Sequence, residues 1–321
     1  MPKFNVNEEG HPSVDIFYSV TGDGPNHIIF INGLGSILRQ WDLQVDFFRE
    51  LPEFSTLVYD NRGSGFSSAP EGRYSTSQLA KDAFLLLKHI GWQKVHIVGI
   101  SMGGMIAQEL SHLLENDVLS LTLVSTYSKF NGIPISILEP TDDTMINILN
   151  PRKLVEGSLK TIQQLFNTPG QNTIELFAEQ TVEVLFPQDW LSAPYKGSND
   201  EHPITNRENM HKFFVDRFSE TGLQSPAGRF GQRNACLTHY FDRRLEELAA
   251  YSYPKLILTG DQDKITRQPI SSEYLANCLR GKLVIYKNGG HALRMQDPEW
   301  HNQQLLDHFR STYTSNEPEE E

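Results

Sequence analysis

Cysteine is scarce in this chain, whose 321 residues include only Cys236 and Cys278. Two cysteines cannot build the disulfide framework of a small secreted domain, so a reducing compartment is expected. No apolar run reaches the length of a membrane-spanning helix, and residues 1–5 do not have the pattern of a signal peptide. Together these absences predict a cytoplasmic protein without a membrane span.

Basic residues are also in the minority. The 28 Lys and Arg residues face 40 Asp and Glu residues, which gives a net charge of −12. Such an acidic chain repels phosphate backbones and anionic lipid surfaces, so neither nucleic acid nor a membrane is expected as a partner. A hydrophobic content of 38% suits a globular protein, and the length predicts one large domain with an insertion.

A serine between glycines is the most informative feature that is present. Ser101 has Gly99 two positions before it and Gly103 two positions after it, between an apolar run at 94–98 and a helical pattern at 105–114. A serine on a sharp strand-to-helix turn needs small neighbours and exposes its oxygen at the edge of a sheet. A Gly/Ser turn without chemistry is the alternative for the short motif alone, and the flanking strand and helix disfavour it.

A second glycine-rich turn lies upstream. Residues 27–31 predict a buried strand, and residues 32–35 follow it with the sequence Asn-Gly-Leu-Gly. A turn of this kind can direct a backbone N–H group at an oxyanion. An ordinary strand-exit turn would have the same glycines, so this motif alone leaves both interpretations open.

A base and a carboxylate to orient it are available later in the chain. The predicted strand 254–259 is followed by Asp261 and Asp263, and the predicted strand 282–286 is followed by His291. Carboxyl ends of parallel strands meet at one edge of a sheet, so these side chains can converge on Ser101. Either aspartate could instead be an ordinary turn residue.

His291 is the strongest of the eleven histidines because it alone follows a strand in a glycine turn close after the acid. His96 lies within a predicted strand and is expected in the core or at a sheet edge. Four other histidines fall on helical patterns and are expected on the surface: His89, His112, His301 and His308.

The two turns, together with the chain order serine, acid, histidine, resemble the α/β-hydrolase superfamily. The resemblance implies Ser101 as nucleophile and His291 as general base. It favours Asp263 over Asp261, because the family pattern is G-x-x-D, and it implies the backbone amides of Leu34 and Met102 as oxyanion donors. The family usually has histidine at position 32, where this chain has asparagine; that side chain is not an oxyanion donor.

Two further marks of the family are interpreted as structural. Residues 60–67 resemble its D-x-R-G-x-G-x-S turn, in which Arg62 is expected to hold loops near the site. Trp41 follows the first glycine turn, where an aromatic residue is common in the family, and packing is its expected role.

The predicted fold class is α/β, with a doubly wound, mostly parallel central sheet and an inserted helical lid. The sheet domain is expected to comprise 1–128 and 253–321, and the lid 129–252, which lacks strand alternation. Lid aromatics could line an acyl pocket, although most are expected to form the lid's own core. These aromatics are Phe166, Phe177, Phe186, Trp190, Phe213, Phe214, Phe218 and Phe230.

Within the superfamily, serine at position 101 disfavours the branch with an aspartate nucleophile. The sequence 102–104 is most similar to small carboxylesterases, enol-lactonases and cofactor-free haloperoxidases. The resemblance implies a serine hydrolase that cleaves a small carboxylic ester, lactone or thioester through an acyl-enzyme, with no metal or organic cofactor. A C–C bond hydrolase, a perhydrolase with the same triad, or a ligand receptor with little turnover are the alternatives.

Overall fold

The computed structural model describes residues 2–7, 13–129, 173–198, 201–266 and 270–313. Within these residues, eight strands form one sheet in the order β1-β2-β4-β3-β5-β6-β7-β8. β2 is antiparallel to both of its neighbours, and every neighbouring pair from β4 to β8 is parallel. The mostly parallel α/β sheet is confirmed. The strands are β1 (Lys3–Val6), β2 (Val14–Thr21), β3 (Asn26–Ile31), β4 (Phe54–Tyr59), β5 (Val95–Ile100), β6 (Val118–Val124), β7 (Lys255–Gly260) and β8 (Lys282–Tyr286).

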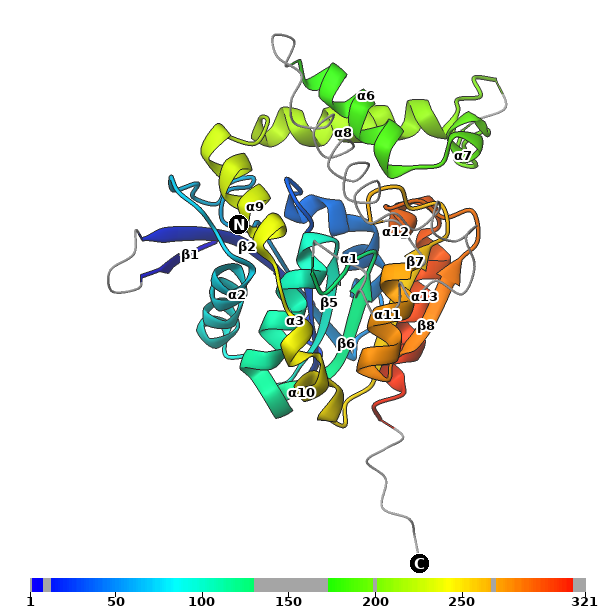
Figure 1. The fold of residues 1–321 in the computed structure, drawn as a ribbon. Helices are drawn as coiled ribbons and strands as arrows, with labels where there is room; N and C mark the ends of the chain where they lie inside the picture. Colours follow the sequence, from blue (N-terminus) through cyan, green and yellow to red (C-terminus); the bar gives the residue numbers. More distant parts are fainter. Residues whose placement is uncertain (1, 8–12, 130–172, 199–200, 267–269, 314–321) are drawn as a thin grey trace, which may run out of the picture.

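Helices cover both faces of the sheet, as expected for a doubly wound fold (Figure 1). Side chains alternate along β5, so Val95 and Ile97 face one layer while Val98 and Ile100 face the other. The first layer consists of α2 (Thr76–Ile90), α3 (Met102–Leu114), α10 (Leu245–Ala250) and α11 (Ile270–Leu279). The second consists of α1 (Asp42–Arg49) and α13 (Pro298–Arg310). The strands are therefore buried on both sides.

Helix α2 has a capping residue at its start, an apolar face and a glycine at its end. The Ser75 side chain accepts a hydrogen bond from the Gln78 amide at 3.1 Å and so caps the first turn. Leu79 and Leu86 lie on the apolar face and are fully buried. Gly91 ends the helix at a φ of 79°, a left-handed conformation that glycine adopts without strain.

The described segment between β6 and β7 is helical. It contains α6 (Ile174–Leu185), α7 (Gln188–Ser192), α8 (Asn206–Thr221), α9 (Pro226–Thr238) and a short 3-10 helix, η4 (Asp242–Arg244), before α10. Figure 1 shows α6, α7 and α8 grouped beyond one end of the sheet, next to the short helix α12 (Leu293–Gln296). Residues 130–172, which include Phe166, lie outside the described residues.

The aromatic side chains of this segment lie in different environments. Phe186, Phe214 and Phe218 are buried in a cluster that α6 and α8 share with Met295. Phe230 is 55% exposed, so it belongs neither to a core nor to a pocket. The helical segment therefore supplies a buried apolar cluster from α6 and α8 and an exposed ring from α9.

For two histidines, the surface position predicted from the helical pattern is wrong. His301 and His308 of α13 are buried, with 0% and 8% of their surface exposed, rather than on the surface. Positions 301, 305, 308 and 309 fall on one helical face, so Leu305 and Phe309 bring both histidines against the sheet. His96 is fully buried as expected, and its Nδ1 lies 2.8 Å from Ser120 Oγ.

Candidate active site

Ser101 occupies a strained turn between β5 and α3. Its φ of 56° and ψ of −122° are unusual for a residue with a side chain and cost on the order of 1–3 kcal/mol. A Cβ atom on Gly99 would lie 2.2 Å from the Gly103 carbonyl oxygen, so only glycine fits there. The turn is held by a hydrogen bond from the Ser101 amide to Val124 at 2.9 Å and one from Thr126 Oγ1 to the Ser101 carbonyl at 2.7 Å.

His291 and Asp263 lie at the carboxyl ends of β8 and β7 and contact each other. His291 Nδ1 is 2.8 Å from Asp263 Oδ2, and the two residues are only 6% and 4% exposed. Asp263 also accepts hydrogen bonds from the Ile265 amide at 2.9 Å, and from the Thr266 amide at 3.1 Å and hydroxyl at 2.6 Å. The structure thus orients the carboxylate fully before any ligand binds.

The electrostatics of this pair define the histidine tautomer. Burial alone would raise the pKa of Asp263, but the opposite charge of His291 and the hydrogen bonds from His291 and Thr266 outweigh it, so the pKa is lowered. An ionised carboxylate only accepts hydrogen bonds, so Nδ1 of His291 must donate. In the neutral imidazole, Nε2 is then left as the proton acceptor.

Asp261 does not contact His291. Its amide donates to the Tyr286 carbonyl at 3.2 Å, and its side-chain Oδ1 is buried without a hydrogen-bond partner. Of the two aspartates considered from the sequence, the structure brings Asp263 to the histidine.

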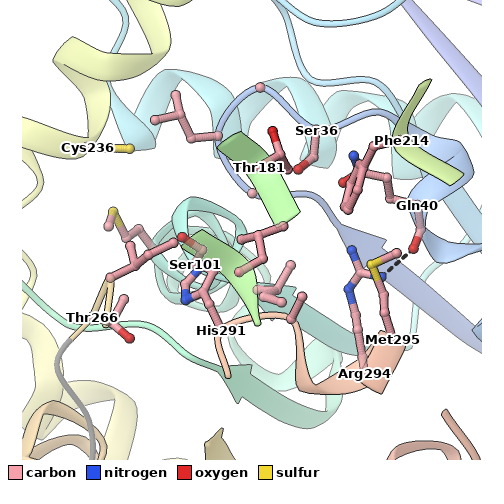
Figure 2. Close-up of a pocket in the computed structure, with 18 of the residues that line it drawn as sticks. Ser36, Gln40, Ser101, Thr181, Phe214, Cys236, Thr266, His291, Arg294 and Met295 are labelled. Carbon is pink, nitrogen blue, oxygen red and sulfur yellow. Dashed lines mark hydrogen bonds between the residues drawn. The ribbon is translucent and has the colours of Figure 1, made fainter. Parts of the chain in front are cut away.

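Ser101 and His291 line a single pocket (Figure 2). The loop after β3 lines it as well, and a Cβ atom on Gly33 would lie 3.9 Å from Ser101 Oγ. Leu34 follows in this loop. Met102 is the first residue of α3, where a backbone N–H has no acceptor within the helix. Both amides therefore belong to backbone segments that border Ser101.

The opposite wall of the pocket comes from α6 and α8. We call these residues the roof: Phe177, Thr181, Leu185, Phe214 and Phe218. Their side chains are mostly apolar, and Thr181 Oγ1 donates to the Phe177 carbonyl of its own helix at 2.7 Å. The roof gives the pocket an apolar surface facing Ser101.

The turn at 60–67 has the structural role expected from its sequence. Arg62 binds Asp82 of α2 through two hydrogen bonds of 2.6 and 2.5 Å, and both residues are buried. Asp60 accepts from the amides of Leu38 and Phe66 at 2.7 and 2.9 Å, and burial raises its pKa to about 6. These bonds fix the start of the 3-10 helix η1 (Leu38–Trp41), which flanks the pocket.

Asn32 and Trp41 also act in packing. Asn32 Nδ2 donates to the Tyr59 carbonyl at 3.0 Å, which joins the ends of β3 and β4. Trp41 is fully buried, with its ring centre 4.8 Å from that of Phe30. The departure from the family pattern at position 32 therefore leaves the neighbourhood of Ser101 intact.

Sequence reasoning missed Arg294, which lines the same pocket from α12. It follows His291 by three positions and is only 3% exposed. One signal could have found it: a single charged residue stands within the apolar stretch 292–295 directly after the histidine turn.

Metal ligands do not gather in the described part of the chain: no group of three or more His, Cys, Asp or Glu side chains there could hold a metal ion. None of the helices in that part is both long and apolar enough to cross a membrane.

The fold and the position of Ser101 at a strand–helix turn define a known class. The family described as alpha/beta hydrolase fold matches residues 26–298, and the chain belongs to this family. The protein is thus a member of a hydrolase family, and its relatives cover several small-molecule hydrolases.

Two relatives illustrate the range. A 3-oxoadipate enol-lactonase from Acinetobacter baylyi is 39% identical over 84 residues, which cover 26% of this chain and 31% of the relative. A protein named as a carbamate hydrolase from Caulobacter segnis is 24% identical over 296 residues, which cover 91% of this chain and 95% of the relative. These relatives support a hydrolase of small substrates.

Solved structures agree on the fold. A thermophilic esterase from Thermogutta terrifontis superposes with a TM-score of 0.70 at 19% identity, covering 97% of this chain and 99% of the esterase. The enol-lactonase from Burkholderia xenovorans gives 0.68 at 18% identity, covering 92% and 97%. At such identities the likeness concerns the fold alone.

Proposed function

We propose that this protein is a serine hydrolase that cleaves a small carboxylic ester, lactone or thioester through an acyl-enzyme. Ser101 is the nucleophile, His291 the general base and Asp263 the residue that orients the base. The observation that carries the proposal is the 2.8 Å contact between His291 and Asp263 in the pocket that also holds Ser101 on its strained turn. An imidazole oriented by a buried carboxylate beside a serine is the arrangement that activates a hydroxyl group.

The first half of the reaction forms the acyl-enzyme. Ser101 Oγ attacks the acyl carbon while its proton passes to Nε2 of His291. The carbonyl oxygen becomes negatively charged and accepts hydrogen bonds from the amides of Leu34 and Met102. The positive end of the α3 dipole stabilises this charge further. His291 then returns the proton to the leaving oxygen or sulfur as its bond to carbon breaks.

The second half releases the acid. A water molecule loses a proton to His291 and attacks the acyl carbon of the ester on Ser101, and His291 then protonates the departing Oγ. Asp263 stays ionised and stabilises the imidazolium in both halves. The imidazole must be neutral at the start of each half, because a protonated His291 cannot accept a proton.

Residues 129–252 act as the lid in this proposal. The roof supports this assignment, since its side chains from α6 and α8 lie in the same pocket as Ser101. An apolar roof excludes water around the acyl group and selects its size.

The test uses a fluorophosphonate probe and a panel of p-nitrophenyl esters and lactones. The wild-type protein should be labelled on Ser101, as identified by peptide mapping. Ser101→Ala should abolish labelling and lower kcat by on the order of 10⁶-fold. Ser192→Ala, an exposed serine on α7, is the matched control and should behave as wild type.

Unchanged labelling of Ser101→Ala would refute the assignment. Labelling without turnover of any ester or lactone would point instead to C–C bond hydrolysis, perhydrolysis or ligand reception.

A further inference from the structure

Arg294 is a buried cation in the wall of the Ser101 pocket. Its Nη1 donates to the Gln40 carbonyl oxygen, and its guanidinium carbon lies 4.5 Å from the centre of the Trp41 ring. Nε is buried without any hydrogen-bond partner. Figure 2 shows the Gln40 contact on one side of the guanidinium and its other two nitrogens on the side of Ser101 and His291.

No carboxylate of the described residues neutralises Arg294. It takes part in no ion pair there, and none of the other described residues that line the pocket is Asp, Glu or Lys. The contrast with Arg62 is informative. Arg62 is equally buried, at 4% exposed, but it forms a two-pronged pair with Asp82. Of these two buried arginines, only the one in the pocket lacks a counter-ion.

An unpaired charge in a dry environment is costly, and a protein normally supplies a partner for it. Burial lowers the pKa of Arg294 to about 9, so the side chain is still a cation at neutral pH. The contacts with Gln40 and Trp41 hold the guanidinium in place but do not cancel its charge. None of the described residues supplies the missing partner, so a bound ligand is a candidate for it.

We propose that the substrate has a carboxylate that pairs with Arg294, so that the site takes esters, lactones or thioesters whose acyl part ends in an acid group. The guanidinium has N–H donors besides the one that binds Gln40, and such charged donors match the oxygens of a carboxylate. Arg294 thereby acts as a specificity residue at one end of the pocket, with Ser101 at the reacting end. The hydrolytic part of this inference rests on the proposed function, whereas anion binding at Arg294 does not.

A structural role is the competing explanation. Arg294 could serve only to brace η1 through Gln40 and Trp41. In that case its replacement would change stability or overall turnover, but it would not discriminate between charged and neutral ligands. A ratio of two substrates therefore separates the explanations.

The kinetic experiment compares monomethyl with dimethyl esters of succinic, glutaric, adipic and pimelic acid. The wild-type enzyme should show a higher kcat/KM for the monoester, whose far end is a carboxylate, for at least one chain length. Arg294→Met should lower the monoester-to-diester ratio by about 10- to 100-fold, the range for a lost charged hydrogen bond. Arg294→Lys should retain part of the preference, and Arg310→Met, which removes an exposed arginine paired with Glu53, should leave the ratio unchanged.

The binding experiment does not depend on hydrolysis. Calorimetry measures glutarate, adipate and dimethyl glutarate binding to Ser101→Ala, with and without Arg294→Met. Dicarboxylate binding that disappears with Arg294→Met supports the inference even if no ester is turned over, a result that would count against the proposed function alone. Turnover of neutral esters with no carboxylate preference and no dicarboxylate binding overturns the inference and leaves the proposed function standing.

The proposal can still be tested if Arg294→Met fails to fold. The wild-type ratio and the Arg294→Lys ratio remain measurable, and a wild-type preference for the diester at every chain length refutes the proposal.

Discussion

The two walls of the Ser101 pocket are built on different principles. The wall opposite the roof, which we call the floor, consists of the loops at 32–35, 99–103, 260–266 and 288–292. In the floor, polar atoms have defined partners, such as Asp263 with its hydrogen bonds to His291, Ile265 and Thr266. The roof relies on apolar contacts between rings, which are not directional.

This difference assigns different tasks to the walls. Proton transfer needs atoms placed within a fraction of an ångström, and only hydrogen bonds and tight glycine turns give such placement. Choice of an acyl group needs a surface of suitable size and polarity, which packed side chains can provide. Changes in the floor should therefore affect rate, and changes in the roof should affect preference.

After the loss of the Ser101 hydroxyl group, the largest effect is expected from the two aspartates that follow β7. Asp263→Asn keeps the shape of the side chain but favours the wrong imidazole tautomer, which should lower kcat by on the order of 10⁴-fold. Asp261→Asn is the matched control and should have little effect, because Asp261 makes no contact with His291. Steady-state kinetics on one p-nitrophenyl ester compares them. A severe loss in Asp261→Asn together with a mild loss in Asp263→Asn would require exchanging the two roles.

The layer formed by the sheet and α13 should be sensitive to acid because it contains buried neutral histidines. Burial lowers the pKa of His96 and His301 to about 3 and that of His308 to about 4, well below the ordinary value of 6.5. Below pH 6.5 these histidines bind protons in the unfolded chain but not in the folded protein. Their contribution to the free energy of unfolding is therefore complete above that pH and is lost as the pH is lowered. The loss should reach up to about 2 kcal/mol per histidine by about pH 5.

Urea unfolding at pH 7 and pH 5 measures this loss. His301→Leu should reduce this loss of stability by the contribution of one histidine, because leucine does not take up a proton. His202→Gln changes an exposed histidine and should leave the pH dependence as it is in the wild type. An equal pH dependence in all three proteins would mean that the buried rings do not resist protonation.

The smallest effect is expected in the roof. Phe218→Leu removes part of a pocket-lining ring and should shift preference toward longer acyl chains by about 3- to 10-fold relative to acetate. Phe213→Leu is the control, because this neighbouring ring packs against Arg217 and does not line the pocket. A chain-length series of p-nitrophenyl esters gives the result. Parallel losses on all chain lengths with a lower Tm would show that Phe218 serves only the helical core.

The floor could be predicted from the sequence more fully than the roof, for a physical reason. Ser101, His291 and the two aspartates each follow a buried strand, so the rule that parallel strands share a carboxyl edge brings them together, and the family pattern selects Asp263. The lid aromatics were candidates both for the pocket and for the lid core. Arg294 lies in α12, a helix of 4 residues that is too short for any periodicity. The roof depends on how α6 and α8 pack, and an apolar helix face looks the same whether it meets a core or a pocket.

The buried histidines of α13 show the limit of the helical pattern as well. A histidine on an amphipathic helix is usually assigned to the polar side. Here His301 and His308 share the face of Leu305 and Phe309, and the sheet below them sets their environment. The 4 residues of β1 are also too few for their sequence to predict a strand, and β1 is defined by its pairing with β2.

The order of the strands has a consequence for a chain still being synthesised. β5 and β6 place Ser101 on its turn early, but β7, which carries the orienting acid, begins only at Lys255, and His291 follows β8. A nascent chain that stops before β7 would contain the serine without either proton-handling partner. Under the proposed mechanism, the serine of the unfinished chain is therefore unreactive, and reactivity toward acyl groups begins only when the last two strands have docked.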